Sequence, residues 1–166
     1  DKRDALLLQT PESLKERYNL DVRVFTEVLS IYTVDKKVSV KNLQTGEIYL
    51  ESYDKLLLSP GAEPIKPPFE GIDSDKIYTL RNIPDMDKIV SKTKNAQNFV
   101  VVGGGFIGLE VAENLIEAGK SVKLVELGNQ VMAPVDFDIA SFVHEKAKQK
   151  GLELLLNVGV EKFNDK

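Results

Sequence analysis

The spacing of apolar and polar residues divides the chain into two stretches of different periodicity. Between residues 21 and 50, apolar positions alternate with polar ones, as at Val38 and Val40, and Thr45-Gly46 is typical of a hairpin turn. The almost wholly apolar run 53–58 is typical of a strand buried on both faces. We expect a small antiparallel meander with strands over residues 21–31, 37–42 and 47–50, followed by the strand 53–58.

A helix precedes the meander. Thr10 suits the N-cap, Pro11 the first helical position and Glu12 the first turn, so the pattern predicts a helix that ends near Asn19. After the meander, prolines at positions 64, 67 and 68 make a stiff segment that cannot enter a sheet interior. We place a domain boundary there, which gives domains 1–66 and 67–166.

Beyond the prolines, helical and strand periodicity alternate. The order βαβαβ predicts an α/β fold, a Rossmann-like doubly wound parallel sheet, with the 99–103 strand central and the 122–126 strand beside it. Because such a nucleotide domain needs more strands, we expect it to be truncated here. The expected helices are 83–94, 106–118 and 136–150, and the expected strands are 99–103, 122–126 and 152–156.

Composition restricts the function classes. The chain has 166 residues, of which 42% are hydrophobic and 29% charged, with a net charge of −4. An acidic chain without a Lys/Arg cluster is a poor match for nucleic acid or an anionic membrane. No apolar run approaches the ~20 residues of a membrane span, and the N-terminal residues 1–4 lack the order of a signal peptide. We therefore expect a cytoplasmic protein.

Cysteine is absent and there is one histidine. These residues can therefore form no disulfide, no thiolate metal site and no cysteine nucleophile, and a His-rich metal site is excluded as well. His144 stands among Glu145, Lys146 and Lys148, so we expect an exposed surface residue rather than a catalyst.

The strongest chemical signal is a glycine motif after a predicted strand. It has the form G-x-G-x-x-G and opens a predicted helix, which is the context of a dinucleotide-binding turn. The first glycine permits a tight turn, the second lets a pyrophosphate approach the backbone, and the third allows close helix packing. The helix N-terminus offers free N–H groups to the diphosphate. The motif consists of Gly103, Gly104, Gly105, Phe106, Ile107 and Gly108.

Glu126 ends the second strand of this unit, where the adenosine ribose of a bound dinucleotide must lie. A carboxylate there accepts hydrogen bonds from ribose hydroxyls and repels a 2′-phosphate. No arginine follows in residues 127–130, and alternation places Lys123 poorly for reaching such a phosphate. The sequence therefore favours NAD(H) over NADP(H).

Four stretches carry a family resemblance. Residues 47–64 resemble the end of the FAD domain of pyridine nucleotide–disulfide oxidoreductases, 79–87 the start of their NAD domain, and 100–126 its nucleotide core. Residues 5–12 resemble the coenzyme A-disulfide reductase and persulfide reductase branch, with NADH oxidases as near relatives. The resemblance covers essentially the whole chain.

The resemblance implies a flavoenzyme that passes a hydride from NADH to FAD, and electrons onward to a cysteine and a small disulfide or persulfide. It also implies that the redox cysteine and the FAD glycine motif lie upstream of Asp1, and that a C-terminal dimerisation domain makes the parent a homodimer. We therefore expect an inactive central fragment that holds no catalytic residue, binds NAD(H) and retains no FAD by itself.

The resemblance also implies roles for single residues, each with a structural alternative. Phe106 would cover the flavin or only pack at the helix start, and Glu110 would meet the nicotinamide carboxamide or only favour the helix dipole. The remaining residues have structural alternatives too, because a valine in a strand usually packs in the core and charged residues on an exposed helix usually only contact solvent. The other implied contacts are Val28 with the FAD adenine, Ser59, Pro60 and Gly61 with the FAD phosphates, and Lys15 and Arg17 with coenzyme A phosphates.

Two other functions stay open at this point. The absence of cysteine and of an FAD motif favours a non-catalytic NAD-binding or redox-sensing module. An NADP-dependent Rossmann reductase of another kind is disfavoured by Glu126 and by the meander that precedes the glycine motif. Within the family, the acceptor could be coenzyme A disulfide, a persulfide or, for an NADH oxidase, oxygen.

Overall fold

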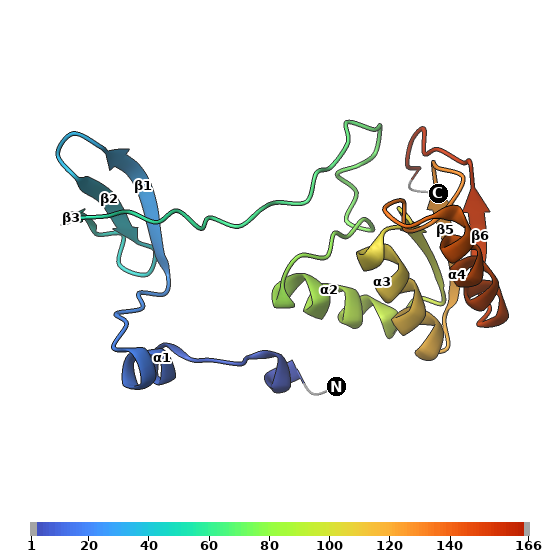
Figure 1. Cartoon of the computed structure of the whole chain (residues 1–166), viewed down its shortest axis with the longest axis horizontal. Helices are drawn as coiled ribbons and strands as arrows, with labels where there is room; N and C mark the ends of the chain where they lie inside the picture. The colour runs from blue at the N-terminus through green and yellow to red at the C-terminus, as the bar shows by residue number, and fades with distance from the viewer. Residues whose placement is uncertain (1–2, 165–166) are drawn as a thin grey trace. The chain divides into compact units, whose positions relative to one another are not determined.

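The computed structural model describes residues 3–164; Asp1 and Lys2, part of the stretch compared with a signal peptide, lie outside them. The chain separates into two compact units, which are described one at a time (Figure 1). Unit 1 is Asp1–Pro60 and unit 2 is Gly61–Lys166. No helix among residues 3–164 is long and apolar enough to cross a membrane.

Unit 1 begins with a short 3-10 turn, η1 (Arg3–Leu6), and the helix α1 (Pro11–Tyr18). Thr10 caps α1 as predicted, because its hydroxyl accepts the Ser13 N–H (3.2 Å) while the Ser13 hydroxyl accepts the Thr10 N–H (2.9 Å). The helix ends at Asn19, whose φ of 55° is left-handed.

Three antiparallel strands complete unit 1 in the order β1-β2-β3, which confirms the predicted meander. Their bounds are β1 Thr26–Tyr32, β2 Lys37–Asn42 and β3 Ile48–Ser52. Val40 of the central strand stands opposite Val28 and Tyr49. Among the residues of unit 1 whose burial the structure describes, the buried ones are Val38, Ser39 and Val40, in the middle of β2.

The strand predicted over 53–58 was wrong, because these residues are irregular. A strand needs a neighbour for its backbone groups. The Tyr53 N–H does reach the Lys36 carbonyl (2.9 Å), but residues 54–58 join no sheet among residues 3–164, and Leu57 is 90% exposed.

Unit 2 has the predicted alternation of helices and strands. Its three strands form a parallel sheet in the order β4-β5-β6. The expectation that the 99–103 strand is central was wrong for the described sheet, because each crossover adds the next strand on the same side and leaves β5 in the middle. The elements are α2 Ile83–Thr93, β4 Asn98–Val102, α3 Phe106–Glu117, β5 Ser121–Glu126, α4 Phe137–Gln149 and β6 Glu153–Leu156.

The core of unit 2 is built around β5. Val122 and Leu124 point to one face of the sheet and are at most 1% exposed. They pack with two residues of α3, Ala112 and Leu115, and with Val131 from the connection between β5 and α4. The helices on this face therefore fix the carboxyl end of β5, where the glycine motif lies beside it.

The first and last described segments of unit 2 meet. Glu70 forms a parallel bridge with Lys162, and its carbonyl accepts the Phe163 N–H (2.8 Å). The rings of Phe69 and Phe163 lie 6.3 Å apart between centroids. Gly71 has a φ of 81° and a Cβ there would overlap the Phe163 carbonyl oxygen, so glycine permits this close approach.

Candidate nucleotide-binding site

The site is built on the turn between β4 and α3, residues 103–108, called the glycine turn below. Gly103 has a φ of 99°, which favours glycine, and its N–H donates to the Val125 carbonyl (2.8 Å). A Cβ at Gly108 would lie 2.0 Å from the Gly103 carbonyl oxygen. The first and third glycines thus serve the backbone turn and the close packing of α3.

Gly105 differs from the other glycines of the turn. Its φ of −74° suits any residue, and a Cβ there would meet no heavy atom within 4 Å. It is the N-cap of α3, and no side chain caps the helix. The free N–H groups and the positive end of the helix dipole therefore face open space, which is the arrangement that binds a diphosphate.

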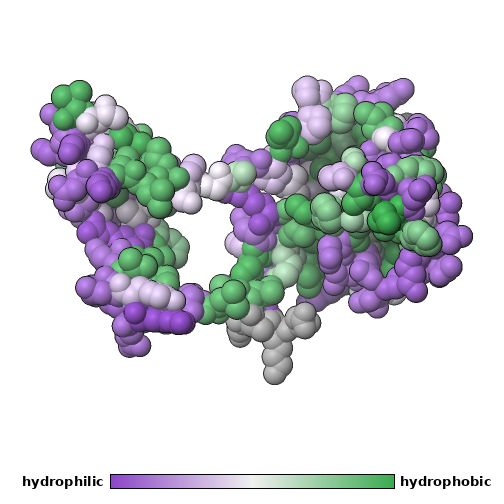
Figure 2. Space-filling view, in the orientation of Figure 1, coloured by the Kyte–Doolittle hydropathy of each residue, from purple (hydrophilic) through white to green (hydrophobic). Residues whose placement is uncertain are grey.

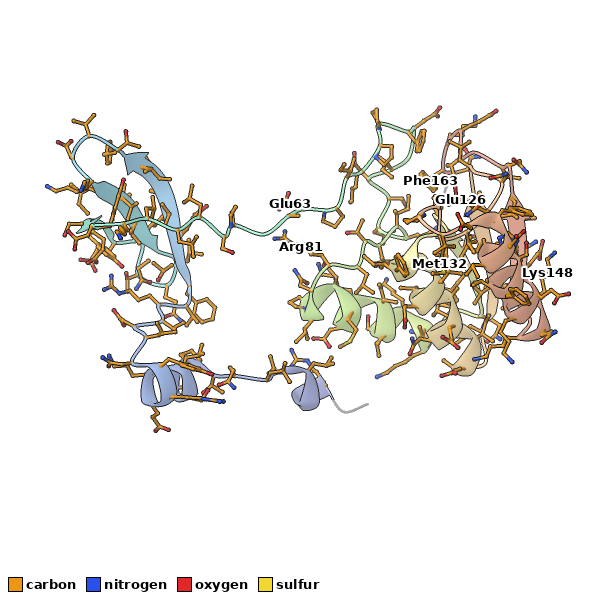
Figure 3. All side chains as sticks on the ribbon, viewed as in Figure 1. Glu63, Arg81, Glu126, Met132, Lys148 and Phe163 are labelled. Atoms are coloured by element: carbon orange, nitrogen blue, oxygen red, sulfur yellow. The ribbon has the colours of Figure 1, made fainter. Side chains whose placement is uncertain are left out.

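Gly104 is buried and held from both sides. Its N–H donates to Oε2 of Glu126 (2.6 Å), and its carbonyl accepts the Met132 N–H (2.8 Å). Figure 3 labels Glu126 and Met132. A Cβ added at Gly104 would lie 2.7 Å from Cγ1 of Val131. The G-x-G-x-x-G pattern leaves this position free, but in this chain the packing requires glycine.

Glu126 lies at the end of β5 and joins two loops. Besides the Gly104 contact, its Oε1 accepts the Gly128 N–H (2.7 Å). Each carboxylate oxygen keeps a second lone pair, so Glu126 can still accept hydrogen bonds from a diol. Lys123 is engaged elsewhere, since its Nζ lies 2.9 Å from a carboxylate oxygen of Glu153.

Residues 2–166 match the family described as pyridine nucleotide-disulphide oxidoreductase. The chain belongs to this family. Among curated relatives, it is 36% identical to the coenzyme A disulfide reductase of Staphylococcus haemolyticus over 99% of this chain and 37% of that protein. The chain thus spans little more than a third of the length of such relatives.

Solved structures of the family agree with the fold. The reduced CoADR-RHD of Bacillus anthracis matches with a TM-score of 0.93 at 46% identity, over 99% of this chain and 30% of that one. The water-forming NADH oxidase of Lactobacillus brevis bound to NADH matches at 0.92 and 32%, over 100% and 37%. An engineered NADPH-bound variant of that oxidase matches at 0.92 and 30%, over the same shares.

Phe106 and Glu110, two further predicted site residues of this oxidoreductase chain, are exposed on the first turns of α3. Both line a groove of about 280 Å³ between α3 and α4, together with Met132 and mostly apolar residues of both helices. Ile107 is 63% exposed beside them. Phe106 belongs to the glycine turn and Glu110 lies one helical turn later on α3. The roles expected from the resemblance stay predictions.

The remaining predicted site residues are described within their own units. In unit 1, Val28 is 55% exposed on β1, Lys15 and Arg17 are exposed on α1, and Ser59 and Pro60 lie in irregular chain. Gly61 begins unit 2 with a φ of 75°, and a Cβ there would lie 3.0 Å from Nη2 of Arg81. Their predicted contacts with FAD or coenzyme A stay predictions.

The expectation that His144 is a surface residue was wrong. Its side chain is buried, at 9% exposure, and Nε2 accepts the Val131 N–H (3.1 Å). Glu145 and Lys146 lie on other sides of α4, whereas His144 lies in line with Ala140, four residues earlier and 0% exposed, and with the exposed Lys148, four residues later. Burial lowers the pKa of His144, and the charge of Lys148 adds to this, so the neutral form is favoured.

Sequence reasoning missed two residues that hold the site. Val131 and Met132 contact the glycine turn from the connection between β5 and α4, a stretch without periodicity. The spacing of His144 from Ala140 was the available signal that a polar side chain faces the core there.

Proposed function

We propose that this chain is the central part of an FAD-dependent oxidoreductase, in which unit 2 binds NADH and orients its nicotinamide toward the flavin. The observation that carries the proposal is the open space at Gly105 beside the uncapped N-terminus of α3. The other three glycines of the turn have reasons within the fold, whereas no contact within the fold requires glycine at position 105, and the open space there leaves room for a ligand. A pyrophosphate has the charge and the size for that position.

Glu126 supports NADH rather than NADPH as the nucleotide. At ~4 Å and an effective dielectric of ~20, a carboxylate repels each unit of 2′-phosphate charge by about 4 kcal/mol. Relaxation and salt reduce this to about 1–3 kcal/mol, roughly tenfold to a hundredfold in affinity. Lys123 cannot offset the repulsion while it is paired with Glu153.

The engineered NADPH-bound oxidase supports the same assignment. It carries a glycine-to-alanine and an aspartate-to-alanine change separated by the same number of positions as Gly108 and Glu126, and an arginine directly after the changed aspartate. In that protein the substitutions accompany NADPH; here the unaltered pair, Gly108 and Glu126, favours NADH.

When bound, NADH supplies a hydride, and the chain's own residues bind and orient it. The glycine turn and the α3 N-terminus hold the diphosphate, Glu126 the ribose, and Phe106 and Glu110 the nicotinamide end. FAD and the redox cysteine belong to other parts of the parent, so this chain alone retains no flavin. The final acceptor is a small disulfide or persulfide, and the homodimeric state and cytoplasmic location stay predictions.

Oxygen is the second candidate acceptor. The NADH oxidase of Enterococcus faecalis is 36% identical over 95% of this chain and 35% of its own length, which is similar to the coenzyme A disulfide reductase match. A non-catalytic NAD-binding module is the third. NADH consumption by the flavin-loaded full-length protein, with and without coenzyme A disulfide or a persulfide under anaerobic conditions, separates the three.

Nucleotide binding is tested by Gly105→Ala in the full-length protein. Because the added methyl meets nothing in the fold but occupies the diphosphate position, we expect at least a tenfold (about 1.4 kcal/mol) loss of NADH affinity. Thermal stability should fall only slightly, since alanine is a poorer N-cap than glycine. Glu117→Ala, at the exposed opposite end of α3, is the matched control and should bind NADH normally. Unchanged affinity in Gly105→Ala would contradict the proposal.

Cofactor choice is tested by Leu127→Arg. Leu127 is 76% exposed, so an arginine there adds a cation next to Glu126 without disturbing the Glu126 contacts. We expect the NADH over NADPH preference in kcat/KM to fall about tenfold. Gly128 is less suitable, since a Cβ there would lie 3.2 Å from Oε1 of Glu126. An unaltered protein that prefers NADPH would show that Glu126 does not face the ribose.

A further inference from the structure

His144 is a buried polar residue that the proposed chemistry does not use. Its Nε2 accepts the Val131 N–H (3.1 Å), and the ring of Phe137 stands edge-on at 6.4 Å between centroids. For Nε2 to accept, the imidazole must be neutral with its proton on Nδ1. Burial, and then the charge of Lys148, lowers the pKa of His144 and so favours that neutral state.

The hydrogen bond from Val131 connects His144 to the glycine turn. Val131 is 0% exposed, and its Cγ1 fills the space where Gly104 would carry a Cβ. The next N–H, of Met132, donates to the Gly104 carbonyl (2.8 Å). Residues 131 and 132 thus hold Gly104 by packing and by a hydrogen bond, and α4 holds residue 131 through His144.

Glu126 holds the same peptide group from the other side. Its Oε2 accepts the Gly104 N–H (2.6 Å), so both backbone polar groups of Gly104 are paired before any nucleotide arrives. A turn fixed in this way binds a diphosphate without first losing conformational freedom. The neighbouring N-cap, Gly105, follows Gly104 directly in the chain, and no side-chain hydrogen bond caps the helix there.

We propose that His144 is a positioning residue that fixes the glycine turn for the nicotinamide dinucleotide through the Val131 N–H. This inference rests on the proposed function of the turn. Without the acceptor, the Val131 N–H is buried and unpaired, so residues 131 and 132 shift toward other partners and Gly104 loses its fixed position. Nucleotide binding must then restore the turn, which weakens affinity without altering the reacting groups.

The experiment compares variants of His144 in the full-length protein by NADH titration and by steady-state kinetics. His144→Leu fills the space but removes the acceptor, and we expect the Kd and KM for NADH to rise about fivefold to tenfold with kcat retained. His144→Gln places an amide oxygen near the position of Nε2 and should restore NADH affinity to within about twofold. Should the leucine variant fail to fold, His144→Asn, whose shorter amide cannot reach Val131, takes its place.

Two further variants separate a positioning role from general stability and from failure of the proposed function. Phe137→Leu removes the ring beside His144 but keeps the acceptor, so it should lower stability without changing NADH affinity. Two results would refute the positioning role and leave the proposed function standing. In the first, Gly105→Ala weakens NADH binding while His144→Leu does not. In the second, His144→Leu and His144→Gln weaken NADH binding equally. If Gly105→Ala leaves binding unchanged, the proposed function and this inference fall together.

Discussion

The two units of this chain use similar apolar patterns and reach different degrees of burial. In unit 2, Val122, Leu124 and Val131 are at most 1% exposed beneath α3 and the β5–α4 connection. In unit 1, Val28 and Leu50 remain 55% and 58% exposed on β1 and β3, and Figure 2 shows apolar atoms gathered on the surface of this unit. Alternation of apolar residues therefore predicts strands, but only a covering layer makes a core.

The two units differ in whether a sheet face is covered by helices of its own unit. The βαβ connection brings its own helices, so unit 2 covers the β5 face with residues of its own sequence. A meander has hairpin connections and brings no cover. The exposed apolar surface of unit 1 is larger than isolated surface residues explain and marks a face suited to burial against other protein.

Removal of a core side chain should lower stability most. Leu124→Ala should destabilise unit 2 by about 3–5 kcal/mol, because it removes a fully buried side chain and leaves a cavity. Leu50→Ala, the matched change on β3, should cost clearly less than Leu124→Ala, because more than half of the Leu50 side chain is exposed in this chain. Urea unfolding of the full-length protein measures both, and equal losses would mean that Leu50 is buried by another part of the parent.

A smaller effect distinguishes two glycines, one from each unit. Gly104→Ala places a methyl 2.7 Å from Val131 in the core and should cost about 1–3 kcal/mol. Gly46→Ala, in the β2–β3 hairpin, meets no atom and suffers only from its φ of 78°, so we expect about 1 kcal/mol. Thermal melting shows which of the two variants loses more stability. An unchanged melting temperature for Gly104→Ala would show that Val131 moves aside freely.

The smallest effect concerns pH. Because burial, and then Lys148, lowers the folded-state pKa of His144 below its ordinary value of 6.5, its contribution to stability is complete above 6.5. It is lost as pH falls from 6.5 through the folded-state pKa, at a slope of at most about 1.4 kcal/mol per pH unit. His144→Gln should reduce this slope in urea unfolding between pH 7.5 and 5.5. Unit 1 contains no histidine, so its unfolding should show no such term.

Much of the fold was predictable because local signals agreed with the tertiary arrangement. Thr10 and Pro11 set the start of α1, and the glycine turn joins β4 to α3 as its motif requires. The strand at 53–58 could not be excluded from sequence, because an apolar run indicates burial but does not show whether a neighbouring strand is there to pair with it.

Sequence reasoning named the glycines and Glu126, which the structure brings together, and it missed the residues that support them; that the glycines and Glu126 bind a nucleotide stays a prediction. Val131 and Met132 act through backbone N–H groups and packing, which any residue type can provide, so no pattern marks them. His144 was misjudged because the charges next to it in sequence outweighed its helical spacing from Ala140. A residue's neighbours in a helix are those three and four positions away.

The contact of Glu70 and Gly71 with Lys162 and Phe163 has a consequence for the order of folding events. Because the two segments stand far apart in the sequence, their contact closes a long loop, and the entropy of loop closure opposes it until the elements between them have formed. The contact therefore forms late, after β4, β5 and β6 have paired. A change at Gly71 acts on how fast unit 2 unfolds more than on how fast it folds.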